Sequence, residues 1–140
     1  MSPRHLLAAL ALVSSLALAA CGSEDQQSTQ AAAKPEQETT AAQARTEIGE
    51  VRTALDGAVA AMGDGDAAKA EQLVSEGYLQ HFEKVEGPLG KVDHDLTEKL
   101  EESIREQLRD KIKGGGSAAE IKTMVTAIKA DLATAEQKLQ

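Results

Sequence analysis

The fold is decided by residues 117–139, which read SAAEIKTMVTAIKADLATAEQKL. Apolar residues recur in this stretch at three- and four-residue spacing, which places them on one face of a helix. They are Ile121, Met124, Val125, Ile128, Leu132, Ala135 and Leu139. Ser117 and Glu120 have the spacing of a capping box, in which each side chain bonds the backbone amide of the other residue. The stretch therefore predicts an amphipathic helix with a defined start.

Three upstream segments show the same spacing and predict helices over residues 41–62, about 67–86 and 94–113. Gly63 to Gly65 break the first helix, and Asp66 is placed to cap the second. Gly87 and Pro88 predict the end of the second helix. The connections are short, and no segment alternates as a strand would. The sequence therefore predicts an all-α fold, an antiparallel up-and-down four-helix bundle over residues 41–140.

Residues 1–20 are typical of a lipoprotein signal peptide. A thin basic start is followed by an uncharged run from Leu6 to Ala20, which is shorter than the about 20 apolar residues of a membrane span. The run ends in Leu18-Ala19-Ala20-Cys21, which resembles the lipobox of bacterial lipoproteins at every position. We expect Cys21 to carry covalent lipid. An ordinary secretory signal with a chance cysteine, or an uncleaved anchor, would be the alternatives.

Residues 21–40 contain no large apolar side chain after the cysteine, and they predict a disordered tether between the lipid and the helical domain. The chain is thus expected outside the cytoplasm, in the cell envelope, attached to a membrane through its lipid. Its formal net charge of −8 argues against a nucleic-acid partner and favours cations or a basic protein. The helical domain alone is expected to be soluble and monomeric.

Catalysis is not expected. The sequence has no phosphate-binding glycine motif and no hydroxyl nucleophile in a recognisable context, and its single thiol is predicted to be lipidated. Asp64-Gly65-Asp66 begins like a calcium loop but lacks the later ligands, so a turn followed by a helix cap is the better interpretation. Any metal site must therefore use carboxylate oxygen and imidazole.

The second predicted helix contains the only tyrosine and the only phenylalanine of the chain, Tyr78 and Phe82. At 100° per residue, His81 falls near the middle of the apolar arc on which they lie. Glu86 lies just beyond the arc, Glu83 lies one turn before Glu86, and on the third helix Glu101 borders the apolar stripe. Carboxylates and histidines from facing helices bind iron or manganese in some bundles. The simpler alternative is a histidine hydrogen-bonded to one glutamate, with the other carboxylates in water.

Tyr78, Phe82-Glu83 and Glu86, followed by Asp93, Leu100-Glu101 and Arg109, resemble a known pattern. This is the extracytoplasmic amino-terminal helical domain of the oxidase-linked family of bacterial high-affinity iron permeases. The resemblance covers the second and third helices. It implies iron handling outside the cytoplasm, with Glu83, Glu86 and Glu101 as metal-binding positions, and His81 is added from its place on the helix.

The sequence departs from the permeases because it lacks their transmembrane helices and their membrane-embedded paired-glutamate motif. The resemblance therefore implies an accessory that binds iron, or manganese, or that docks to an iron permease. The alternative function is a helical interaction module without metal, whose partner is another envelope protein.

Overall fold

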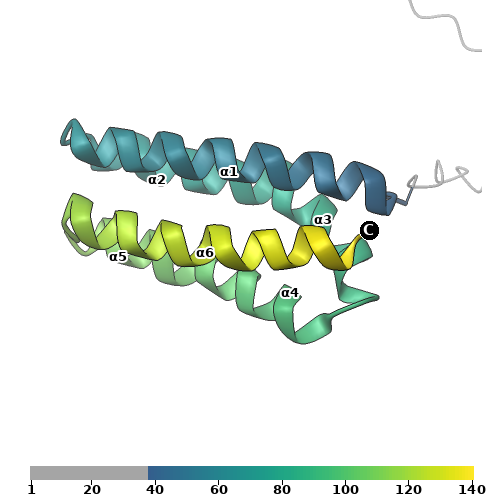
Figure 1. The fold of residues 1–140 in the computed structure, drawn as a ribbon. Coiled ribbons are helices and arrows are strands. Elements are labelled where there is room, and N and C mark those ends of the chain that lie inside the picture. The colour runs from purple at the N-terminus through teal and green to yellow at the C-terminus, as the bar shows by residue number, and fades with distance from the viewer. Residues whose placement is uncertain (1–37) are drawn as a thin grey trace, which may run out of the picture. The chain divides into compact units, whose positions relative to one another are not determined.

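The computed structural model describes residues 38–140, which are helical over nearly their whole length (Figure 1). Within that range the backbone forms four helices and no strand, which confirms the prediction of an all-α fold for the described residues. The predicted signal peptide, Cys21 and nearly all of the predicted tether lie outside the described range. No helix within residues 38–140 combines the length and the apolar character that crossing a membrane requires.

The second and third helices each contain a π-helical segment, so each is divided into three labelled parts. The elements are α1 (Ala41–Gly63); α2 (Ala67–Glu76), η1 (Gly77–Phe82) and α3 (Glu83–Gly90) in the second helix; α4 (His94–Glu101), η2 (Glu102–Leu108) and α5 (Arg109–Lys113) in the third helix; and α6 (Ala118–Lys138).

The predicted helix starts are confirmed. Ser117 and Glu120 form the expected capping box at α6, where the amide of Glu120 donates to Ser117 Oγ at 3.3 Å and the amide of Ser117 donates to Glu120 Oε2 at 2.9 Å. Asp66 and Asp93 cap the second and third helices, each accepting an amide hydrogen bond from the first turn. These caps satisfy backbone donors that have no partner within the helix.

The predicted end of the second helix is wrong, because the helix continues through Gly87 and Pro88 to Gly90 instead of ending at Glu86. Proline removes one backbone donor and crowds the preceding turn. Leu89, however, is fully buried, and its carbonyl accepts two amide hydrogen bonds from the following loop. Burial of this side chain stabilises the additional turn against the cost of the proline.

The two π-helical segments change how side chains are distributed around the helix axis. Their hydrogen bonds run from residue i to i+5, so each residue advances less around the axis than in an α-helix. η1 and η2 lie in facing helices, and the guanidinium carbon of Arg105 in η2 lies 5.8 Å from the ring centroid of Tyr78 in η1. Positions worked out at 100° per residue therefore do not hold along these segments.

The apolar stripes of all four helices meet in one core. Its largest fully buried side chains are Phe82, Ile48, Leu55, Leu89, Leu100, Ile104, Leu108, Ile121, Leu132, Val51, Val74 and Val85. α1 packs closely on the second helix at Gly77, where a Cβ atom would lie 2.8 Å from the Cβ of Ala54. Glycine is therefore required at that crossing.

Candidate functional site

Tyr78 and Glu86 form a hydrogen-bonded pair on the second helix. The Tyr78 hydroxyl donates to Glu86 Oε1 at 2.8 Å, and Tyr78 is only 5% exposed. Burial is the main cause of the raised pKa of Tyr78, and the hydrogen bond to Glu86 raises this pKa further. Tyr78 is therefore held as the neutral phenol, which keeps it a hydrogen-bond donor to the carboxylate.

Glu86 carries an electrostatic cost when it is ionised. Burial raises the pKa of Glu86, and the neighbouring charges of Glu101 and Glu83 raise it further, while the bond from Tyr78 opposes them. A raised carboxyl pKa means that the folded state favours the protonated form, so this group destabilises the fold increasingly as pH rises through its titration range. A cation beside Glu86 would relieve that cost.

Arg105 already supplies a positive charge at this place. Its Nη1 lies 2.7 Å from Glu101 Oε1 and its Nη2 lies 2.8 Å from Glu106 Oε1, while the guanidinium stands over the ring of Tyr78. Glu106 and Glu101 contribute to a raised pKa of Arg105, so it remains charged. The sequence contained a signal for this pair, because Glu101 and Arg105 have the i, i+4 spacing that favours ion pairs on helices.

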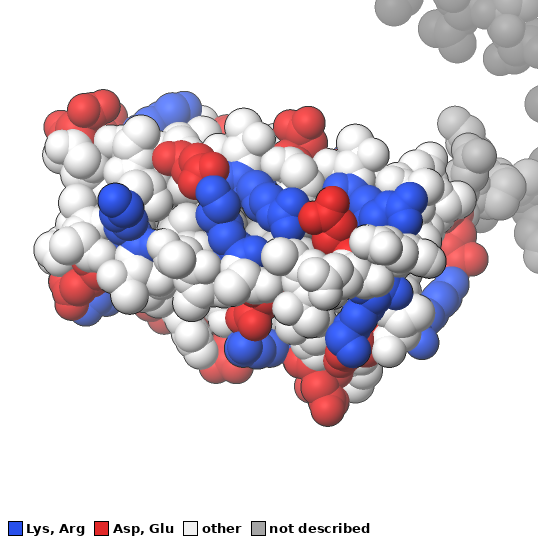
Figure 2. All heavy atoms as spheres, in the orientation of Figure 1, with Lys and Arg blue, Asp and Glu red and all other residues white. Residues whose placement is uncertain are grey.

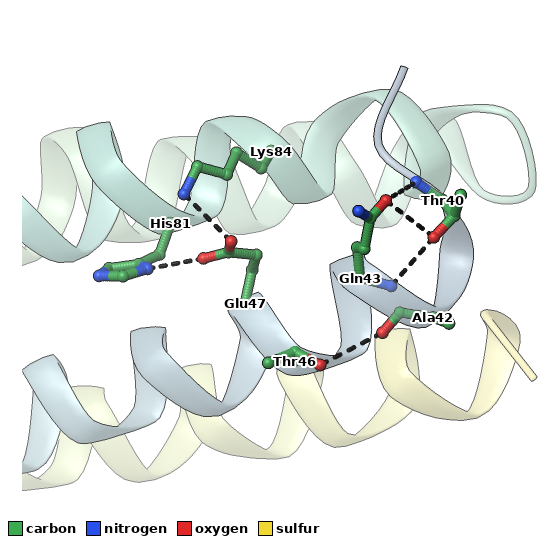
Figure 3. Close-up of polar contacts among 7 residues, drawn as sticks. All are labelled: Thr40, Ala42, Gln43, Thr46, Glu47, His81 and Lys84. Carbon is green, nitrogen blue, oxygen red and sulfur yellow. Dashed lines mark hydrogen bonds and ion pairs between the residues drawn. The ribbon is translucent and has the colours of Figure 1, made fainter. Parts of the chain in front are cut away.

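His81 lies at the other side of the second helix, against α1. Its Nδ1 is 2.7 Å from Glu47 Oε2, and Lys84 Nζ donates to the other oxygen of Glu47 at 3.0 Å. Figure 3 shows both side chains pointing toward Glu47. A polar pocket of about 260 Å³ adjoins them, lined by Glu47, Lys84, Thr39 and Gln43.

The side chain of His81 is 27% exposed, so its expected place in the middle of the apolar arc is wrong. The π-helical winding of η1 accounts for the difference. Glu47 was missed because it belongs to a different helix, and no spacing within the sequence indicates it. The structure does realise the simpler alternative for this histidine, a hydrogen bond to one glutamate.

The structure therefore brings Glu86, Glu101 and exposed Glu83 near enough for the charges of Glu101 and Glu83 to raise the pKa of Glu86, and it pairs His81 with Glu47 of α1 instead. Among residues 38–140, no three His, Cys, Asp or Glu side chains are grouped so as to hold a metal ion. A cation bound at Glu86 and Glu101 would compete with Tyr78 and Arg105, which contact Glu86 Oε1 and Glu101 Oε1.

The other residues on which the resemblance to the iron permeases depends stabilise the fold. Phe82 is fully buried, and Asp93 caps the third helix. Arg109 of the third helix pairs with Glu71 of the second. Glu71 Oε1 accepts hydrogen bonds from Arg109 Nε at 3.0 Å and from Arg109 Nη2 at 2.6 Å. These positions are explained by packing and pairing without any ligand.

We expect His81→Ala to destabilise the fold by about 1 kcal/mol, because it removes a charge-assisted, partly exposed contact between two helices. For a domain of this size that corresponds to a fall in Tm of about 4–8 °C. The hydrogen bond to His81 is the main cause that lowers the pKa of Glu47, and Lys84 lowers it further. Glu47 therefore stabilises the fold above the ordinary pKa of glutamate, and this stabilisation is lost as pH falls through the lowered pKa. The effect should therefore be measured by thermal unfolding near pH 7 and repeated near pH 3.

His94→Ala is the matched control for this prediction. His94 is 72% exposed and pairs only with Glu98 on its own helix, at 3.3 Å. Its replacement should change stability by less than about 0.5 kcal/mol. Equal effects of the two substitutions would show that the His81 contact contributes nothing beyond a surface pair.

Comparisons of this chain with protein-family models, with curated proteins and with solved structures found no match.

Proposed function

We propose that this protein is a lipid-anchored lipoprotein of the cell envelope that assists iron uptake outside the cytoplasm, by binding iron or by docking to a transporter. The anchor is the lipid predicted on Cys21, and residues 21–40 are the tether. The observation that carries the proposal is the Tyr78–Glu86 pair, whose carboxylate lies within the influence of Glu101 and Glu83. Glu83, Glu86 and Glu101 are the positions that the resemblance to iron permeases assigns to the metal.

The proposed scaffold is an antiparallel up-and-down four-helix bundle. Contacts between α1 and α6 support this arrangement, because positions later in α1 meet positions earlier in α6. Arg52 pairs with Glu136, and Asp56 pairs with Lys129. The second and third helices follow the same rule, as Glu71 meets Arg109 and Tyr78 meets Arg105. The connections between successive helices are short enough for such a bundle. They comprise residues 64–66, 91–93 and 114–117.

The available donors suit iron in its role as cargo. Carboxylate oxygens are hard ligands that favour ferrous, ferric or manganese ions over softer metals. Tyr78 contacts Glu86 Oε1 and Arg105 contacts Glu101 Oε1, so an incoming ion competes with these partners for the two carboxylates. That competition lowers affinity, which favours transfer of the ion to a transporter over storage.

We expect Mn²⁺ or Fe²⁺ titrated at moderate salt to bind the full chain, and Glu86→Gln and Glu101→Gln each to weaken that binding by about tenfold or more. Binding should also weaken as pH falls, because protons compete for the carboxylates. Bound ion should raise Tm, since it prefers the folded state. Calorimetric titration and thermal unfolding measure these effects in detergent-solubilised protein.

Glu50→Gln is the control for this titration, because Glu50 is exposed on α1 and its loss changes the net charge equally. Glu86→Gln should keep a Tm at least equal to that of the wild type, since the amide oxygen still accepts from Tyr78 and the repulsion from Glu101 and Glu83 is removed. Equal ion binding by all four proteins would contradict the metal site.

A helical interaction module without metal is the second candidate function. One observation favours it: His81 and Glu101 already have protein partners, in Glu47 and Arg105. A titration in which no variant loses affinity relative to the wild type would support this function.

A further inference from the structure

A shallow groove lies between α1 and α6, neither of which contributes a residue to the Tyr78–Glu86 pair. It encloses about 290 Å³, and its lining is mainly apolar. Val59 contributes from α1 and Val125 from α6, while Lys122, Lys129, Asp56 and Thr126 form its polar edge. An apolar floor with a few polar groups around it is typical of a site that receives an apolar side chain.

Basic side chains gather along the same seam, where Figure 2 shows more blue than red on the face formed by α1 and α6. The seam carries Arg45, Arg52, Lys122 and Lys129, with Asp56 and Glu136 between them. This excess of positive charge occurs on a chain that has 23 acidic and 15 basic residues. The face therefore differs in sign from the molecule as a whole.

Part of this charge is already paired. Arg52 contacts Glu136 at 2.8 Å, and Lys129 contacts both oxygens of Asp56, at 2.6 and 2.7 Å. Lys122 is exposed at the edge of the groove. A binding partner would therefore meet a net positive rim at Lys122 and an apolar floor at Val59 and Val125.

We propose that this groove docks an acidic amphipathic helix of another envelope protein. An aliphatic side chain of that helix would cover Val59, which is partly exposed beside the buried Val125, and its flanking carboxylates would face Lys122 and the seam. Helices that bind in grooves use such apolar anchors, and complementary charge selects the partner and speeds association. The inference rests on the docking role within the proposed function and adds the place and the chemistry of the partner.

The test uses the full chain anchored in phosphatidylcholine nanodiscs and a synthetic amphipathic peptide of leucine and glutamate. Amide resonances of Val59, Lys122, Val125 and Thr126 should shift on addition of the peptide, and a leucine-lysine peptide of equal length should not shift them. Lys122→Glu should weaken the binding of the acidic peptide by about tenfold, whereas Lys69→Glu, an exposed control on α2, should weaken it by less than about twofold.

Three outcomes would overturn the inference. The first is an absence of shifts at the groove, and the second is an equal loss of affinity in the Lys122 and Lys69 variants. The third is the same set of shifts caused by phosphatidylglycerol nanodiscs without peptide, which would assign the face to anionic lipid. If the peptide fails to bind while Mn²⁺ still binds, the docking groove is rejected and the proposed ion site is retained.

Discussion

Cys21→Ser should abolish lipid attachment and release the protein from the membrane. The thiolate is the group that accepts the diacylglyceryl chain, and a serine hydroxyl is a far weaker nucleophile. Lipid anchoring depends on the summed burial of acyl chains, at about 0.8 kcal/mol for each buried methylene, so losing the lipid removes nearly all of the affinity. We expect no second anchor, because the residues of the predicted tether are polar and the helical domain is acidic.

Three measurements test this result. Incorporation of labelled fatty acid reports lipid attachment, fractionation with a carbonate wash reports membrane association, and the size of the protein reports processing. The serine variant should take up no label, remain as unprocessed precursor and leave the washed membranes. A variant that stays membrane-bound after the wash and is still processed would show that the Leu18 to Cys21 motif is not a lipobox. Ser23→Ala, just beyond the motif, should behave as the wild type.

Helix positions were predictable from the sequence because the signals that define them are local. Ser117, Asp66 and Asp93 each satisfy amides within one turn, so their roles follow from spacing alone. The end of the second helix was not predictable in this way. Pro88 is a local signal to stop, but it is overridden by the burial of Leu89, which depends on contacts with distant residues.

The candidate site was predictable only in part, for a related reason. Glu86 and Glu101 were expected near each other because both border apolar stripes, and stripes of facing helices meet. His81 was misplaced because the angle of 100° per residue fails within η1. Its partner Glu47 is 34 residues away in the chain, a separation at which only the tertiary packing of α1 on the second helix indicates contact.

Phe82→Ala should destabilise the fold by about 3–5 kcal/mol, because it removes a large buried side chain and leaves a cavity that the neighbours fill incompletely. Phe82 is 0% exposed, and its ring lies 5.8 Å from that of Tyr78 between centroids, tilted by 32°. Tilted aromatic pairs at this distance contribute beyond the area that they bury. Thermal or urea unfolding of the variant measures the loss.

The same substitution should also loosen the proposed ion site, because Phe82 supports the ring of Tyr78, whose hydroxyl bonds Glu86. Leu79→Ala is the matched control: Leu79 lies on the same π-helical segment but is 58% exposed. Its loss should change stability by no more than about 0.5 kcal/mol. Comparable destabilisation by the two variants would mean that η1 does not turn Phe82 into the core, and the winding that moves His81 off the apolar arc would then have to be rejected as well.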